Sequence, residues 1–179
     1  IKEYFLNIKE YEKSGQRGIA YAFTAIPARN SLEQKDWETA ITLAPKTPTY
    51  FPWVEADKRD IGNTHFARAM GFSRLGRPDE AEADIKQLAY MAETLPAMSG
   101  LEYYRMKIES QLLGARAWQS FARGDHENAL SLMKEASEQE ASSKNAPSNP
   151  GDILPAEELL GDMLLELSQI EDAHAAYKL

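Results

Sequence analysis

The chain contains one short pattern four times: Lys35-Asp36-Trp37-Glu38-Thr39-Ala40, Gly76-Arg77-Pro78-Asp79-Glu80-Ala81, Gly124-Asp125-His126-Glu127-Asn128-Ala129 and Ser168-Gln169-Ile170-Glu171-Asp172-Ala173. Each copy predicts a tight turn between two antiparallel helices. The acidic residues fall in the first turn of the second helix, where free N–H groups favour negative charge. The alanine falls where two helix backbones approach closely. A pattern that recurs along a chain is typical of stacked-repeat proteins.

The final alanines of the four copies are residues 40, 81, 129 and 173, at intervals of 41, 48 and 44 residues. Apolar residues recur with helical spacing along most of the chain. The spacing predicts helices at about 2–13, 16–34, 36–44, 60–75, 78–94, 99–123, 126–141, 155–167 and 170–179. We therefore expect a single all-α domain over residues 1–179, a right-handed solenoid of antiparallel helix pairs with units at about 14–44, 60–95, 99–141 and 155–179.

Several helix boundaries have a local physical reason. Pro78 suits the first helical position, where no N–H is needed. Pro27 is expected to kink or split its helix, because its ring removes one hydrogen bond and clashes with the preceding turn. Two pairs have the spacing of a capping box: Ser99 with Glu102 and Ser168 with Glu171.

Two connections are too long for simple turns. Residues 45–58 hold three prolines and an aromatic group, Tyr50, Phe51 and Trp53. We expect an extended strap along the helices of 16–44 and 60–94 with Trp53 mostly buried; the alternative is a plug in the ligand groove. Residues 142–153 have turn composition without periodicity, which predicts a mobile surface loop.

Composition excludes several classes of function. The net charge of −8 argues against nucleic acid and against an anionic membrane surface as partners. The chain has no cysteine, so it has no disulfide or thiolate site, and it fits cytoplasm and periplasm equally. No apolar run of about 18 residues is present. Both ends lie inside amphipathic stretches, so we expect the chain to be a fragment of a longer protein.

The repeat units match a known pattern to different degrees. The fourth unit, with Leu160-Gly161, Leu164, Ala173 and Tyr177, resembles the tetratricopeptide repeat, although the units here exceed its usual length of roughly 34 residues. Longer stretches resemble the C-terminal part of uncharacterised bacterial tetratricopeptide-repeat proteins: Ala25-Ile26-Pro27-Ala28-Arg29, Phe51-Pro52-Trp53, His65-Phe66-Ala67-Arg68-Ala69-Met70-Gly71 and Leu154-Pro155-Ala156-Glu157-Glu158-Leu159-Leu160-Gly161. The resemblance implies the fold and no particular activity.

No catalytic, metal or cofactor signature is present. The three histidines are scattered, and Leu130 stands where a metalloprotease helix beginning at His126-Glu127 would need its second histidine. His65 is expected to be a partly buried structural residue, with a ligand-facing role as the alternative. We expect no enzyme; a hydrolase would need a pocket that holds His65 beside an acid and a nucleophile.

Tetratricopeptide arrays bind partners on a concave groove lined by the first helix of each pair. We therefore expect a protein- or peptide-binding scaffold, and the alternative is a structural or self-associating segment with interrupted core at Phe5 and Tyr177. The lysines and asparagines of a carboxylate clamp are missing, since alanine occupies positions 25, 67 and 115. Four arginines, 29, 68, 74 and 116, either make a mildly basic groove or pair with neighbouring acids. The expected groove-lining residues are Arg29, Asn63, His65, Phe66, Met70, Arg74, Gln111, Trp118, Glu158 and Asp162.

Overall fold

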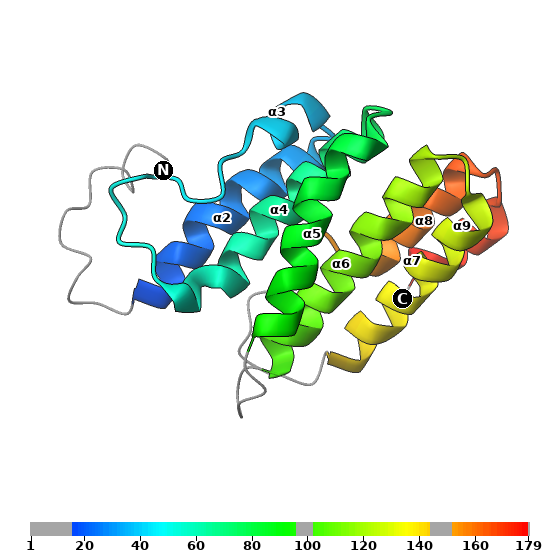
Figure 1. The fold of residues 1–179 in the computed structure, drawn as a ribbon. Helices are drawn as coiled ribbons and strands as arrows, with labels where there is room; N and C mark the ends of the chain where they lie inside the picture. The colour runs from blue at the N-terminus through cyan, green and yellow to red at the C-terminus, as the bar shows by residue number, and fades with distance from the viewer. Residues whose placement is uncertain (1–15, 96–101, 144–151, 179) are drawn as a thin grey trace.

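The computed structural model describes residues 16–95, 102–143 and 152–178, and this part of the chain contains helices and no strand. The helices are α2 (Gln16–Glu33), α3 (Trp37–Thr42), a 3-10 turn η2 (Glu55–Asp57), α4 (Lys58–Arg74), α5 (Pro78–Thr94), α6 (Glu102–Ala122), α7 (His126–Ser143), α8 (Ala156–Glu166) and α9 (Ile170–Ala176) (Figure 1). The all-α prediction is confirmed, and most helix limits lie within about two residues of those expected from the sequence. The helix expected at 2–13 and the capping box at Ser99 lie outside the described residues.

The helices pack in two sets. The even-numbered helices form a row in which α4 contacts α2 and α6, and α6 contacts α8. Each odd-numbered helix packs on the even-numbered helix that precedes it in the chain. The helices α3, α5 and α7 also pack on the even-numbered helix that follows them. Figure 1 shows α4 and α5 side by side, with α6 and α7 next to them.

The four turns that join these helix pairs have the same backbone geometry. Lys35, Gly76, Gly124 and Ser168 have positive φ angles of 52°, 70°, 82° and 60°. Each of these residues donates its N–H to the carbonyl three residues back, and the next residue donates to the carbonyl five residues back. This is the Schellman arrangement, which satisfies the last carbonyls of a helix. Ser168 therefore ends α8 rather than capping α9, whose N-cap is Gln169, so the predicted capping box at Ser168 is wrong.

The alanine of each pattern is completely buried, with 0% exposure at Ala40, Ala81, Ala129 and Ala173. A Cβ placed on Gly71 would lie 3.0 Å from the Ala40 Cβ, so α3 and α4 pass each other at backbone distance. The prediction that small residues mark close helix crossings is confirmed. One apolar core runs from α2 to α8, and a smaller cluster of Leu164, Ala173 and Ala176 joins α8 to α9.

Two local expectations need correction. Pro27 lies inside α2 without splitting it, so of the two effects expected there the split is wrong and the kink stays a prediction. The segment 45–58 is extended only in part, because η2 and the start of α4 occupy its end. Within it Phe51 is 3% exposed, and Trp53 packs against the apolar core, mostly buried as predicted, and donates its indole N–H to the Pro48 carbonyl at 3.0 Å. The segment packs on α2 through Phe23, whose ring centroid lies 5.4 Å from that of Phe51.

The shared turn predicts opposite effects of glycine at different positions. Ser168→Gly should raise the free energy of unfolding by about 1 kcal/mol, because a residue with a Cβ is strained by that amount in the left-handed conformation and glycine is not. Gly124→Ala should lower it by a similar amount, although no atom lies within 4 Å of the added Cβ. Gly114→Ala, inside α6 with its nearest atoms at 3.6–3.9 Å, is the matched control and should be neutral or stabilising. Urea denaturation of the three variants measures these differences; a destabilising Ser168→Gly would contradict the strain argument.

Candidate functional site

Most of the residues expected to line an open groove are buried. Asn63, His65, Phe66, Met70, Gln111 and Trp118 lie in the interior. Arg29, Arg74 and Asp162 are partly exposed, and Glu158 is exposed. The expectation of an open groove along these positions is therefore wrong for the six buried side chains, because other parts of the chain cover them.

The stretch that leads into α8 covers part of this face, including Phe66 and Gln111. Arg29 of α2 donates from Nη2 to the backbone carbonyl of Asp152 at 2.8 Å, across a sequence separation of 123 residues. Ile153 and Leu154, which follow, are 1% and 8% exposed and belong to the main apolar core. The prediction that 142–153 is a surface loop is thus wrong at Ile153, and residues 144–151 lie outside the described part of the chain. We call the face of α2, α4 and α6 that meets Asp152–Leu154 the inner face.

Only a small space remains beneath this stretch. A cavity of about 10 Å³ is bordered by side chains of α4, α6, α7 and α8 together with Asp152 and Leu154. That volume accommodates about one water molecule. The lining residues are Phe66, Lys107, Ser110, Gln111, Gly114, Met133, Glu140, Asp152, Leu154, Ala156 and Leu159. The inner face is therefore filled by the protein's own C-terminal unit.

Ion pairs join α8 to the turn after α2 and to the end of α4. Lys35, in the turn after α2, donates to Asp162 of α8 at 3.1 Å. Arg74, at the end of α4, pairs with Glu166 and lies over the Trp118 ring, 4.3 Å from its centroid. Arg74 with Glu166, and Arg29 with Glu33 at 3.9 Å, show the pairing with neighbouring acids that the alternative interpretation of the arginines predicted. Arg116 is exposed.

Polar side chains form a layer between α2, α4 and α6. Gln111 donates to Asn63 at 3.0 Å, and Asn63 donates to the Thr24 hydroxyl at 3.4 Å. The Lys107 ammonium lies 5.2 Å from the centre of the Tyr21 ring. Lys107, like the three members of the hydrogen-bonded chain, is buried. The inner face is therefore apolar where it meets Ile153 and Leu154, and the polar layer of α2, α4 and α6 lies next to this apolar part.

Two buried charges in this layer have shifted pKa values. Burial lowers the pKa of Lys107, and the carboxylates of Asp152 and Asp60 oppose that shift. Burial raises the pKa of Asp60 to about 6; Arg59 and Lys107 oppose this rise, and Asp57 adds to it. Burial also raises the pKa of Tyr103 to about 12, with Asp152 contributing. No local sequence pattern distinguishes Asp60, Lys107 or Asp152 as candidate site residues.

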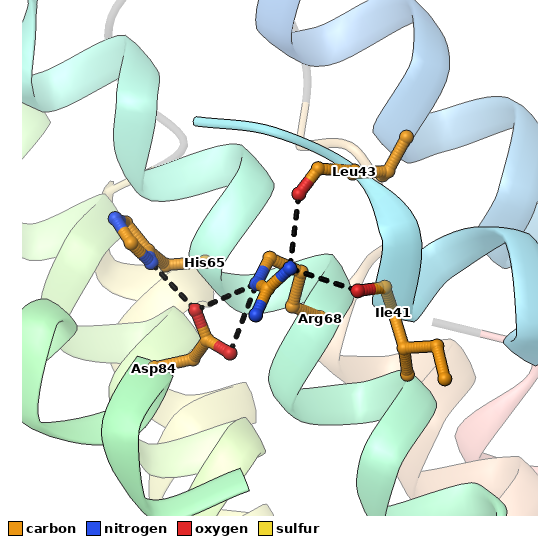
Figure 2. A network of polar contacts seen from close by, with 5 residues as sticks. All are labelled: Ile41, Leu43, His65, Arg68 and Asp84. Carbon is orange, nitrogen blue, oxygen red and sulfur yellow. Dashed lines mark hydrogen bonds and ion pairs between the residues drawn. The ribbon is translucent and has the colours of Figure 1, made fainter. Parts of the chain in front are cut away.

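His65 belongs to a separate network on the other side of α4, towards α5 and α3 (Figure 2). Its Nδ1 lies 2.7 Å from Oδ1 of the buried Asp84, which also accepts from Arg68 Nε at 3.0 Å. Arg68 Nη1 donates to the carbonyls of Ile41 and Leu43 at 2.8 and 3.1 Å, where α3 ends. The network therefore joins α3, α4 and α5.

This network has an imidazole and an acid but no nucleophile. Among the described residues no hydroxyl is hydrogen-bonded to the His65 ring. Arg68, expected as part of a basic groove, instead satisfies the last carbonyls of α3, a role that suits its several fixed donors. Asp84 could have been suspected from the sequence, because a charged residue stands on the apolar stripe of Ala81, Ile85 and Leu88.

Within residues 16–95, 102–143 and 152–178, no cluster of three or more histidine, aspartate or glutamate side chains is placed to hold a metal ion. Nor do these ranges contain a helix both long and apolar enough to cross a membrane.

Comparison with protein-family models, with curated proteins and with solved structures finds no match. The similarity to tetratricopeptide-repeat proteins therefore rests on the sequence motifs alone.

The Asp84 network should contribute strongly to stability. Asp84→Ala leaves His65 and Arg68 without their shared acceptor, and we expect the free energy of unfolding to fall by about 3 kcal/mol. Glu80→Ala, which removes the partner of Arg77 at the surface of the same helix, is the matched control and should change stability little. Chemical denaturation followed by circular dichroism compares the two. Equal effects would show that the network is not a structural tie.

The raised pKa of Asp60 predicts a pH dependence of stability. The folded state resists ionisation of this carboxyl until pH about 6, whereas the unfolded chain ionises it near pH 3.8. Asp60 therefore lowers stability progressively as the pH rises from about 4 to about 6. The difference in the free energy of unfolding between Asp60→Asn and the wild type should be about 2 kcal/mol more favourable to the variant at pH 7 than at pH 4. Asp79→Asn, a change of the same kind at an exposed residue, is the control, and a pH-independent advantage of Asp60→Asn would contradict the assignment.

Proposed function

We propose that this protein is a non-enzymatic scaffold of tetratricopeptide-like helix pairs, forming a right-handed solenoid, that binds a peptide or protein partner on its inner face. Two observations support the architecture. The same left-handed turn recurs after α2, α4, α6 and α8. Each odd-numbered helix packs on the even-numbered row. Both are expected of a stacked helical repeat.

One observation carries the binding role: the inner face holds a stretch of non-helical backbone. Arg29 donates to the carbonyl of Asp152 at 2.8 Å, and the next two apolar side chains are buried. Peptide-binding surfaces combine these elements, because main-chain hydrogen bonds supply affinity and side-chain pockets supply specificity. A surface that accommodates a segment of its own chain in this way has the chemistry to accommodate one from a partner.

The test is selection of peptides from a random library displayed on phage, with the wild-type protein as the target. Selected peptides should bind Arg29→Glu at least about tenfold more weakly, because the variant loses a charge-assisted hydrogen bond to the peptide backbone. Lys134→Glu reverses an exposed charge on α7 and is the matched control, which should bind as the wild type does. Absence of any selected peptide, or equal binding by both variants, would overturn the proposal.

A self-associating role is the second candidate. Leu165 at the end of α8 and Ile170 and Tyr177 on α9 expose large apolar side chains. Contiguous exposed apolar surface is typical of protein–protein contacts. Light scattering over a range of concentrations separates the candidates. A mass that rises with concentration in the wild type and stays monomeric in Ile170→Lys favours self-association.

A further inference from the structure

We infer that Asp152–Leu154 is an intramolecular stand-in for the partner, and that the inner face binds a non-helical peptide with an acidic residue followed by two apolar residues. This inference rests on the proposed binding role. It adds the chemistry of the ligand, and it adds that the ligand competes with the protein's own chain.

Backbone contacts hold the chain at the start of the stand-in and just after it. Arg29 donates to the carbonyl of Asp152, and the carboxylate of Glu140 accepts the N–H of Ala156, the first residue of α8, at 3.1 Å. Both contacts are made to main-chain atoms, so a peptide that adopts the same bent backbone can make them. Two fixed anchors four residues apart define the direction and register of the bound chain.

Side chains between the anchors determine the sequence preference. Ile153 and Leu154 are 1% and 8% exposed, in contact with a core to which Phe66 of α4 and Leu112 of α6 contribute. A polar or charged residue at either position would be buried without a partner, which is costly. The inner face therefore selects two consecutive apolar residues.

Charge determines the preference at the first position. Arg29 and Lys107 are the cations that act on the region of Asp152, and Lys107 is 7% exposed. Lys107, Glu140 and Asp152 line the same small cavity, and Asp60 and Glu140 favour the charged form of Lys107 together with Asp152. Lys107 is held charged in part by the Asp152 carboxylate, because that carboxylate opposes the lowering of its pKa. An acidic residue at the first position of an incoming peptide supplies the same counter-charge.

The experiment uses a fluorescein-labelled peptide with the sequence of residues 150–157, Pro-Gly-Asp-Ile-Leu-Pro-Ala-Glu. Fluorescence anisotropy should show at least tenfold tighter binding to full-length Leu154→Ala than to the wild type, because the variant's own segment competes less well. A control peptide carrying Asp152→Lys should bind Leu154→Ala at least tenfold more weakly than the parent peptide. Equal binding of the two peptides, or equal binding to the two proteins, overturns the inference.

A second measurement covers the case in which Leu154→Ala does not fold. In the wild type under native conditions, the amides of Ile153 and Leu154 should exchange their hydrogens by local opening of the segment, while the amides of α4 and α6 remain protected. Exchange of these two amides only together with α4 and α6 would show a fixed part of the core, and would overturn the inference.

The phage selection distinguishes the two proposals. Selected peptides that depend on Arg29 but lack an acidic residue before two apolar ones, and that the 150–157 peptide does not displace, would contradict the ligand chemistry and leave the binding role standing. Failure to select any peptide with either the wild type or Leu154→Ala would overturn both.

Discussion

The structure depends on a fixed distance along the chain between a left-handed turn residue and a fully buried alanine. Lys35, Gly76, Gly124 and Ser168 end their helices with positive φ, and each is followed five residues later by an alanine with 0% exposure. The Schellman hydrogen bonds reverse the chain within about three residues, so the second helix starts beside the first. A larger side chain in the alanine position would separate the two backbones, since cores do not absorb added volume without strain. The turn and the alanine act together, and the contacts between successive pairs follow from them.

The C-terminal unit changes the environment of the row on which it packs. Asp152 and Leu154 border a small cavity together with the buried Lys107 and Gln111, and Asp60 is buried as well, so these charges interact through a medium of lower dielectric constant than water. Ionised groups are costly in such surroundings unless partners compensate them, and the shifted pKa values of Asp60 and Lys107 reflect that cost. A protein selected for stability alone has little reason to bury these groups beside an apolar contact. The position of Lys107 beside the non-helical stretch Asp152–Leu154 connects this cost with the proposed binding surface.

The sequence predicted the elements that depend on neighbouring residues and missed those that depend on distant ones. Helix limits, Pro78 at a helix start and the buried alanines follow from spacing and local backbone preference, so they were predictable. Ser168 was misassigned because a serine before an acidic helix start suits an N-cap, whereas the left-handed end of the preceding helix took precedence. The filled inner face was not predictable, because it depends on Arg29 meeting Asp152 and Lys35 meeting Asp162 across separations of 123 and 127 residues. The separate network on the other side of α4 did leave a local signal, because Asp84 is a charged residue on an apolar stripe.

The contacts of Lys35 with Asp162 and of Arg29 with Asp152 also bear on cooperativity. In a linear stack each unit touches only its neighbours, so units can melt, be added or be deleted one at a time. Here the first and last described pairs are joined directly, so the stability of each depends on the other as well as on its neighbours in the chain. Loss of α8 would leave α6 partly uncovered and remove the partners of Lys35 and Arg74, and loss of α2 would remove the Arg29 contact to the segment that precedes α8. Such a molecule is expected to unfold as one unit, and its length cannot be altered by whole repeats without rebuilding the closure.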